Sequence, residues 1–332
     1  MASTILEVRG LKKSFEVKNG IFGKKKYLHA VNGLNFSVYE GETFSLVGES
    51  GCGKSTAGRL ISRLIDPTAG EIWIDGEEIS KWKESQLQAI RKKVQMVFQD
   101  PYASLNPRMK IRDIIAEPLV IHTKLTKKEK QRLVSEMLEV VGLNEYQGNC
   151  YAHEFSGGQR QRIGIGRALI MKPKLIIADE PVSALDVSVQ SQILNLLKDL
   201  QEEFNLTYVF ISHDLSVVEH ISDHIGVMYL GSIVEYGPKE QIFTNPLHPY
   251  TKALLSSVPI PDPTVKREKI ILKGDIPNPV NPPSGCKFHT RCPDVMEICK
   301  GKDPSLKQIH TDNHLAACHL YEKTIKNQSV IV

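Results

Sequence analysis

The chain has 332 residues, of which 41% are hydrophobic and 24% charged, and its formal net charge is +4. This is the composition of a globular protein of about two domains, and it excludes collagen, coiled coil and disorder. So small a net charge does not favour nucleic acid, and we expect no such partner. There is no secretory signal pattern and no apolar run of the about 18 residues that span a membrane, so we expect an intracellular chain that reaches a membrane only through a partner.

Apolar, β-branched segments alternate with helical patterns along the first 240 residues. The expected strands lie at 43–47, 94–98, 175–178, 207–211 and 225–229. Such alternation predicts an α/β fold with a parallel sheet flanked by helices. Period-two alternation at 34–38 and 71–75 predicts an antiparallel patch near the start, and a charged helical pattern over 110–143 predicts an inserted helical lobe.

A glycine-rich loop follows the strand expected at 43–47. Its residues are Gly48, Glu49, Ser50, Gly51, Cys52, Gly53, Lys54 and Ser55, followed by Thr56, and they match the P-loop pattern G-x-x-x-x-G-K-S/T at the start of a helix expected over 54–65. In such a loop backbone N–H groups surround phosphate oxygens, Lys54 reaches the outer phosphates and Ser55 ligates magnesium. We therefore predict a site for a nucleotide with Mg²⁺.

Two carboxylates follow the strand expected at 175–178, at the edge where an α/β sheet presents its ligands. We expect Asp179 to hold magnesium and Glu180 to accept the proton of a water that attacks the γ-phosphate. Alone, such a pair is more often a helix cap or a turn. Beside a P-loop the catalytic interpretation is favoured.

A third motif lies between these two. Residues 155–161 read Phe-Ser-Gly-Gly-Gln-Arg-Gln, and with them the chain resembles the ATP-binding cassette (ABC) ATPases. The signature residues are Ser156, Gly157, Gly158 and Gln159, which open an expected helix whose free N–H groups suit a γ-phosphate. Because one chain then carries two phosphate cradles, the resemblance implies a head-to-tail dimer in which the signature of one subunit closes the P-loop site of the other.

The resemblance also implies roles for isolated polar residues. Gln99 would sense magnesium and water, share the metal with Ser55 and Asp179, and link the site to a transmembrane partner. Ser183 and Asp186 would belong to a loop that crosses the dimer interface, and His213 would contact the γ-phosphate. The adenine should stack on an aromatic side chain of the first strands, for which Phe15 and Tyr27 are the candidates.

The implied fold is a P-loop NTPase cassette over residues 1–240, with a RecA-like core, an antiparallel β subdomain and a helical subdomain at about 100–170. Eleven of the 18 prolines lie between residues 246 and 304, which marks residues 241–332 as a small, loop-rich C-terminal extension. Residues 100–108, 245–254 and 288–293 are similar to the oligopeptide and dipeptide permease ATPases, and most to the F-type subunit of oligopeptide permeases.

That similarity implies the ATPase subunit of a bacterial oligopeptide importer, peripheral on the cytoplasmic face of the cell membrane. Its partners would be a second ABC ATPase, giving a heterodimer, two transmembrane permeases and an extracellular peptide-binding protein. Dipeptide or nickel import is the alternative, and a soluble cassette ATPase without a transport role is a remote one.

Four cysteines of the extension, Cys286, Cys292, Cys299 and Cys318, are separated by five, six and eighteen residues. Zinc sites usually begin with two cysteines two to four residues apart, whereas a 4Fe-4S cluster tolerates wider gaps. The resemblance implies such a cluster, with zinc or free thiols as the alternatives. No phosphate motif adjoins these cysteines in sequence, so we expect a structural or redox role for them.

Overall fold

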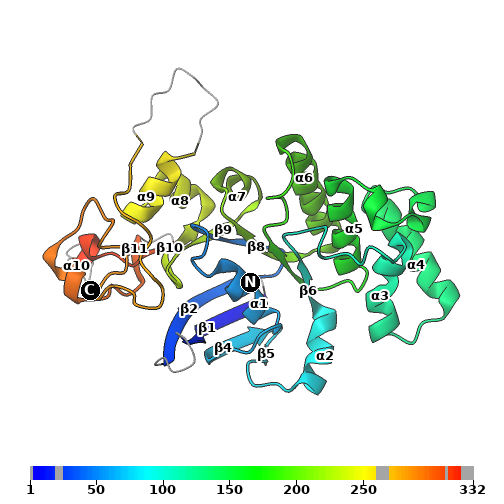
Figure 1. Cartoon of the computed structure of the whole chain (residues 1–332), viewed down its shortest axis with the longest axis horizontal. Coiled ribbons are helices and arrows are strands. Elements are labelled where there is room, and N and C mark those ends of the chain that lie inside the picture. The colour runs from blue at the N-terminus through cyan, green and yellow to red at the C-terminus, as the bar shows by residue number, and fades with distance from the viewer. Residues whose placement is uncertain (1–2, 19–24, 259–268, 311–312, 323–332) are drawn as a thin grey trace.

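The computed structural model describes residues 3–18, 25–258, 269–310 and 313–322. Its core is a sheet of eight strands, whose order is β11-β12-β10-β9-β3-β8-β7-β6 (Figure 1). The strands are β3 (Thr43–Val47), β6 (Val94–Val97), β7 (Leu175–Asp179), β8 (Thr207–Ser212), β9 (His224–Tyr229), β10 (Ser232–Pro238), β11 (Lys307–His310) and β12 (His314–Ala316). The five strands predicted for the parallel sheet are confirmed, each within one residue at either end, and β9, β3, β8, β7 and β6 run parallel.

Helices cover both faces of this sheet. They are α1 (Lys54–Ile61) on one face and α6 (Val187–Phe204) with α7 (Leu215–Ile221) on the other, followed by α8 (Lys239–Thr244). Every residue of β8 is buried, and its side chains alternate between the two layers. Tyr208 and Phe210 belong to the same buried cluster as α6, whereas Val209 and Ile211 belong to that of α1. A strand buried on both sides accounts for the unbroken apolar run in the sequence.

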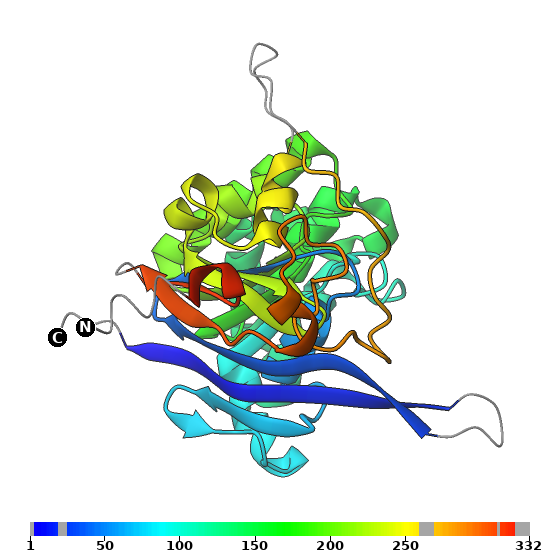
Figure 2. The ribbon, with the colours of Figure 1, turned by 90° about the vertical axis from the view of Figure 1, so that its left-hand side faces the viewer.

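A second sheet carries the predicted antiparallel patch, which is confirmed. It joins β2 (Lys25–Tyr39), β1 (Thr4–Lys18), β4 (Ala69–Ile74) and β5 (Glu77–Glu78) in that order, and α2 (Glu84–Lys93) follows it. In Figure 2 β1 and β2 form a long two-stranded ribbon. Phe15 pairs with Leu28 and Ser14 with His29 in this ribbon.

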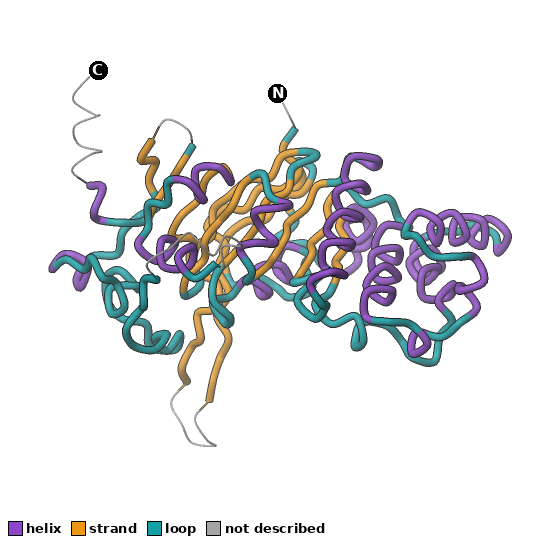
Figure 3. Tube along the Cα trace, turned by 90° about the horizontal axis from the view of Figure 1, so that it is seen from above, coloured by secondary structure: helices purple, strands orange, loops and turns teal. Residues whose placement is uncertain are grey.

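The helical lobe is built from α3 (Ile111–His122), α4 (Lys127–Val140) and α5 (Gly157–Leu169), with two 3-10 turns, η1 (Glu145–Asn149) and η2 (Ala152–Glu154). Ile111, Ile114, Ile115 and Leu119 of α3 are buried, at the spacing of one helix face. Figure 3 shows the lobe on the opposite side of the core sheet from the C-terminal extension.

The extension contains α9 (Pro249–Ser256), α10 (Glu297–Gly301) and η3 (His319–Tyr321) besides β11 and β12. Strand β12 pairs antiparallel with β10, so the extension adds two strands to the edge of the core sheet. The sheet is therefore continuous across residue 240, where the sequence predicts a boundary between two units.

A buried carboxylate anchors the extension to β10. Glu235 is fully buried, and it accepts hydrogen bonds from the backbone N–H groups of Leu247 (2.7 Å) and His248 (2.8 Å). Its Oε1 atom also lies 2.8 Å from Nε2 of His314, which precedes the pairing residues of β12. One side chain thus contacts the segment before α9 and strand β12 at once.

Candidate functional site

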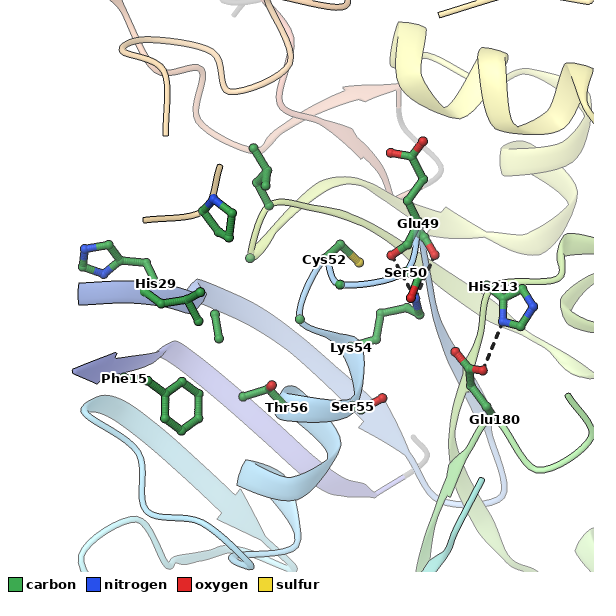
Figure 4. A pocket seen from close by; sticks show the side chains of 18 of the residues that line it. Phe15, His29, Glu49, Ser50, Cys52, Lys54, Ser55, Thr56, Glu180 and His213 are labelled. Carbon is green, nitrogen blue, oxygen red and sulfur yellow. Dashed lines mark hydrogen bonds and ion pairs between the residues drawn. The ribbon is translucent and has the colours of Figure 1, made fainter. Parts of the chain in front are cut away.

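A cavity of about 730 Å³ opens at the carboxyl end of β3. The P-loop residues 48–56 line it, together with Phe15, His29, Gln99, Glu180 and His213 (Figure 4). Phe15 and His29 lie at one side of the P-loop and Glu180 with His213 at the other. A ligand that reaches from Phe15 to Glu180 therefore passes over the P-loop.

Two glycines of the P-loop occupy positions that no other residue fits. Gly48 has φ +151°, and a Cβ atom there would lie 2.2 Å from the carbonyl oxygen of Met228. Gly53 has φ +107°, and its Cβ would lie 2.1 Å from the carbonyl oxygen of Ala30. Gly53 also precedes α1, whose first turn has no side-chain cap and no acidic residue. The free N–H groups of this helix start therefore remain available to an anion.

The P-loop lysine is buried within its own loop. Nζ of Lys54 donates hydrogen bonds to the carbonyl oxygens of Gly48 (2.8 Å) and Glu49 (3.2 Å). Cys52 is also buried, and burial raises the pKa of its thiol. Lys54 thus supports the loop in this state and stands at the place where phosphates would enter.

The hydroxyl of Ser55 donates to Oδ1 of Asp179 over 2.8 Å. Burial raises the pKa of Asp179, while this hydrogen bond opposes the rise. A hydroxyl and a buried carboxylate are hard oxygen ligands, and a divalent cation would compensate the buried charge. The pair therefore fits Mg²⁺.

Glu180 is held at the cavity by three contacts. Its Oε2 atom accepts a hydrogen bond from Nε2 of Gln99 (2.9 Å) and lies 3.1 Å from Nδ1 of His213. Its backbone N–H donates to the carbonyl of Ile211, and its φ is +47°. A non-glycine residue in this left-handed region costs about 1–3 kcal/mol and marks a constrained position. Gln99, predicted to share the metal, donates its hydrogen bond to Glu180 and not to Asp179.

Of the two aromatic candidates for adenine, the structure brings only Phe15 to the cavity. Phe15 is 38% exposed, whereas Tyr27, twelve residues later on the paired strand, is not among the lining residues. Tyr27 pairs with Glu16 in the ribbon, and its contact with adenine stays a prediction. His29 lines the cavity as well, and no pattern in the sequence points to it.

The signature and the interface loop lie outside the cavity of their own chain. The Ser156 hydroxyl caps α5 by accepting from the N–H of Gln159 (3.4 Å), while Gly158 is packed so closely that a Cβ would lie 2.3 Å from Val189. Asp186 caps α6, and hydrogen bonds from Ser188 and Val189 lower its pKa. Ser156, Ser183 and Asp186 are exposed, whereas Gly158 is buried, and the predicted role of these residues in a dimer stays a prediction.

The extension contributes to the cavity, which the sequence does not predict. Leu254 and Pro279 are among the lining residues, and two further residues, Tyr250 and Arg291, contact Glu49 of the P-loop directly. No phosphate motif adjoins the extension in sequence, yet the fold brings the extension against the P-loop.

The four cysteines of the extension are partly or fully buried. Burial raises the pKa of Cys292 to about 11 and that of Cys318 to about 12, and the charges of Cys286 and Cys299 add to both shifts. The N–H of Cys286 donates to the carbonyl of Cys299 over 2.8 Å. Among the described residues, however, no three His, Cys, Asp or Glu side chains are arranged as a metal-binding group. The predicted 4Fe-4S cluster is thus unsupported by the arrangement of the side chains.

None of the described helices combines the length and the apolar character that crossing a membrane requires.

Comparison with known proteins places this geometry in a family. The profile described as ABC transporter matches residues 31–183, and the profile described as oligopeptide/dipeptide transporter, C-terminal region, matches residues 234–299. The oligopeptide transport ATP-binding protein AppF of Bacillus subtilis is 57% identical, over 96% of this chain and 98% of that protein. The dipeptide transport ATP-binding protein DppF of Haemophilus influenzae is 54% identical, over 95% of this chain and 96% of that protein.

Solved structures agree with this result. The dimeric ATP-binding cassette MJ0796, bound to ADP and phosphate, superposes with a TM-score of 0.63 at 30% identity, over 71% of this chain and 99% of that one. The chain therefore belongs to the ABC transporter family, in its group of oligopeptide and dipeptide transport ATP-binding proteins.

Proposed function

We propose that this chain hydrolyses ATP to energise the uptake of oligopeptides by a bacterial ABC importer. One observation carries the ATPase part: the Glu180 carboxylate is held by Gln99 and His213 at the cavity that the P-loop lines. The substrate class is supported by the relatives, among which are oligopeptide transport ATP-binding proteins at 57% and 53% identity.

Each group of residues in the cavity would have its own role in ATP hydrolysis. The N–H groups at the start of α1 would bind the phosphates, and Lys54 would exchange its bonds to Gly48 and Glu49 for phosphate oxygens. Ser55 and Asp179 would hold Mg²⁺, which neutralises phosphate charge when bound. Glu180 would orient the attacking water and take its proton, and His213 would contact the γ-phosphate and steady the carboxylate.

The site needs a second cassette to be complete. The signature residues Ser156 to Gln159 lie outside the cavity of their own chain, and we propose that they close the P-loop site of a partner ABC ATPase in a heterodimer. The partners would include two transmembrane permeases and an extracellular peptide-binding protein, which would hold this chain peripherally on the cytoplasmic face of the membrane.

Reconstitution in proteoliposomes tests the substrate class. With both ATPases, both permeases and the binding protein present, we expect ATP-dependent uptake of labelled tetra- and pentapeptides, and loss of this uptake in a Lys54→Ala variant. Uptake of dipeptides or Ni²⁺ in place of longer peptides would show that the chain serves a dipeptide or nickel importer. ATP hydrolysis that no peptide stimulates would remove the transport role.

We also propose that Cys286, Cys292, Cys299 and Cys318 are ligands of a 4Fe-4S cluster. The support is that the extension carries four cysteines and that the backbone N–H of Cys286 donates to the carbonyl of Cys299 over 2.8 Å, which brings these two residues together. Such a cluster would serve a structural or redox role.

Anaerobic purification tests the cluster. We expect broad visible absorption with iron and sulfide, lost when Cys292 and Cys318 are changed to serine and kept in a Cys150→Ser control. One zinc per chain without visible absorption would replace the cluster by the zinc alternative, and metal-free protein would leave four free thiols.

A further inference from the structure

Glu49, the second residue of the P-loop, forms a bidentate ion pair with Arg291 of the extension. Its Oε2 and Oε1 atoms accept hydrogen bonds from Nη1 and Nη2 of Arg291, over 2.7 and 3.0 Å. The Arg291 side chain is only 8% exposed and that of Glu49 is 26% exposed. A paired, shielded contact of this geometry is stronger and more directional than an exposed ion pair.

The same P-loop residue is held a second time by α9. The backbone N–H of Glu49 donates to the hydroxyl of Tyr250 over 2.9 Å. Tyr250 is fully buried, and its ring packs against Tyr229 and Phe288 at centroid distances of 4.8 and 5.4 Å. This aromatic cluster packs Tyr229 of β9 against Tyr250 of α9 and against Phe288, so the hydroxyl of Tyr250 has a fixed position.

A third contact comes from within the loop. The carbonyl of Glu49 accepts from Nζ of Lys54, the residue expected to reach the phosphates. The N–H, the carbonyl and the carboxylate of Glu49 are thus all engaged, two of them by the extension. Leu254 and Pro279, also from the extension, line the same cavity.

We propose that the C-terminal extension holds the P-loop in its phosphate-binding conformation, with Arg291 and Tyr250 as positioning residues that act through Glu49. A loop that binds anions with backbone N–H groups needs those groups oriented before the ligand arrives, because ordering them on binding subtracts from affinity. Neither residue needs to touch the nucleotide. This inference rests on the proposed nucleotide site.

A double-mutant cycle tests the coupling. The binding of a fluorescent, non-hydrolysable ATP analogue with Mg²⁺ would be titrated in the full chain and in Arg291→Gln, Glu49→Gln and the double variant. We expect each single variant to raise the dissociation constant about tenfold. The double variant should be no weaker than either single variant, because the proposal has Arg291 act on the P-loop through Glu49. Tyr250→Phe keeps the ring and removes the hydroxyl, and it should weaken binding about threefold.

The matched control is Lys300→Ala, which breaks the exposed Lys300–Glu297 pair on α10 in the same extension. It should bind the analogue like the parent. If Arg291→Gln lowers the melting temperature but binds within twofold of the parent, or if the two single effects add in the double variant, the inference is overturned. If Arg291→Gln does not fold, Tyr250→Phe tests the inference in its place. Binding of the analogue by Tyr250→Phe within twofold of the parent would then overturn it. A parent chain that binds no analogue would refute the nucleotide site itself.

Discussion

A Glu180→Gln variant is expected to bind ATP like the parent and to lose steady ATP turnover by about 10²–10⁴-fold. The amide keeps the size and hydrogen-bonding reach of the side chain, so contacts with Gln99 and His213 can re-form. It cannot, however, accept the proton of the attacking water. Phosphate release by the assembled transporter measures turnover, and binding of a fluorescent nucleotide analogue measures the affinity.

The matched control for this variant is Glu203→Gln, at an exposed position near the end of α6. It makes the same chemical change away from the cavity and should hydrolyse ATP at the parental rate. Parental turnover in Glu180→Gln would show that another group takes the proton, whereas lost binding would show that the carboxylate charge supports the cavity itself.

Replacing Glu235 with alanine is expected to lower the free energy of unfolding by about 3–5 kcal/mol. The change removes the acceptor of the Leu247 and His248 N–H groups and one of the partners of His314, all in a fully buried place. Each buried donor that is left without a partner costs about 1–3 kcal/mol. Urea unfolding of the full chain, followed by circular dichroism, measures the loss.

Glu240→Ala is the control for this stability measurement, because the Glu240 side chain is 73% exposed and its nearest ion pair, to Lys239, is 3.9 Å long. We expect a change within about 0.5 kcal/mol for it. A similarly small change in the free energy of unfolding for Glu235→Ala would mean that water enters between β10 and the extension and replaces the lost acceptor.

The sequence predicts those parts of the site that are contiguous in the chain. The P-loop, the strand that ends at Asp179 and the helix start at Ser156 each combine a local pattern with a local structure, so the pattern is enough to place them. The bounds of β3 are predicted without error because a fully buried strand is an apolar run between polar turns.

Contacts that depend on tertiary packing could not be predicted in the same way. Glu49 and Arg291 are 242 residues apart, and no sequence pattern that contains one of them indicates a contact with the other. The choice between Phe15 and Tyr27 depends on the register of the β1–β2 ribbon, which contains several irregularities between residues 4 and 14. The arrangement of the four cysteine thiols depends on a segment with little regular structure, where spacing alone does not fix geometry.

The pairing of β12 with β10 also limits how the protein can be divided. In a fragment that stops at residue 240, β10 would be an edge strand, because Glu235 and Tyr236 would lose their pairing with β12. The Tyr229 ring would also lose its contacts with Tyr250 and Phe288. Such an edge recruits strands from other molecules and promotes aggregation. The smallest unit that keeps the cassette intact therefore extends past Ala316, although the nucleotide-binding motifs end at His213.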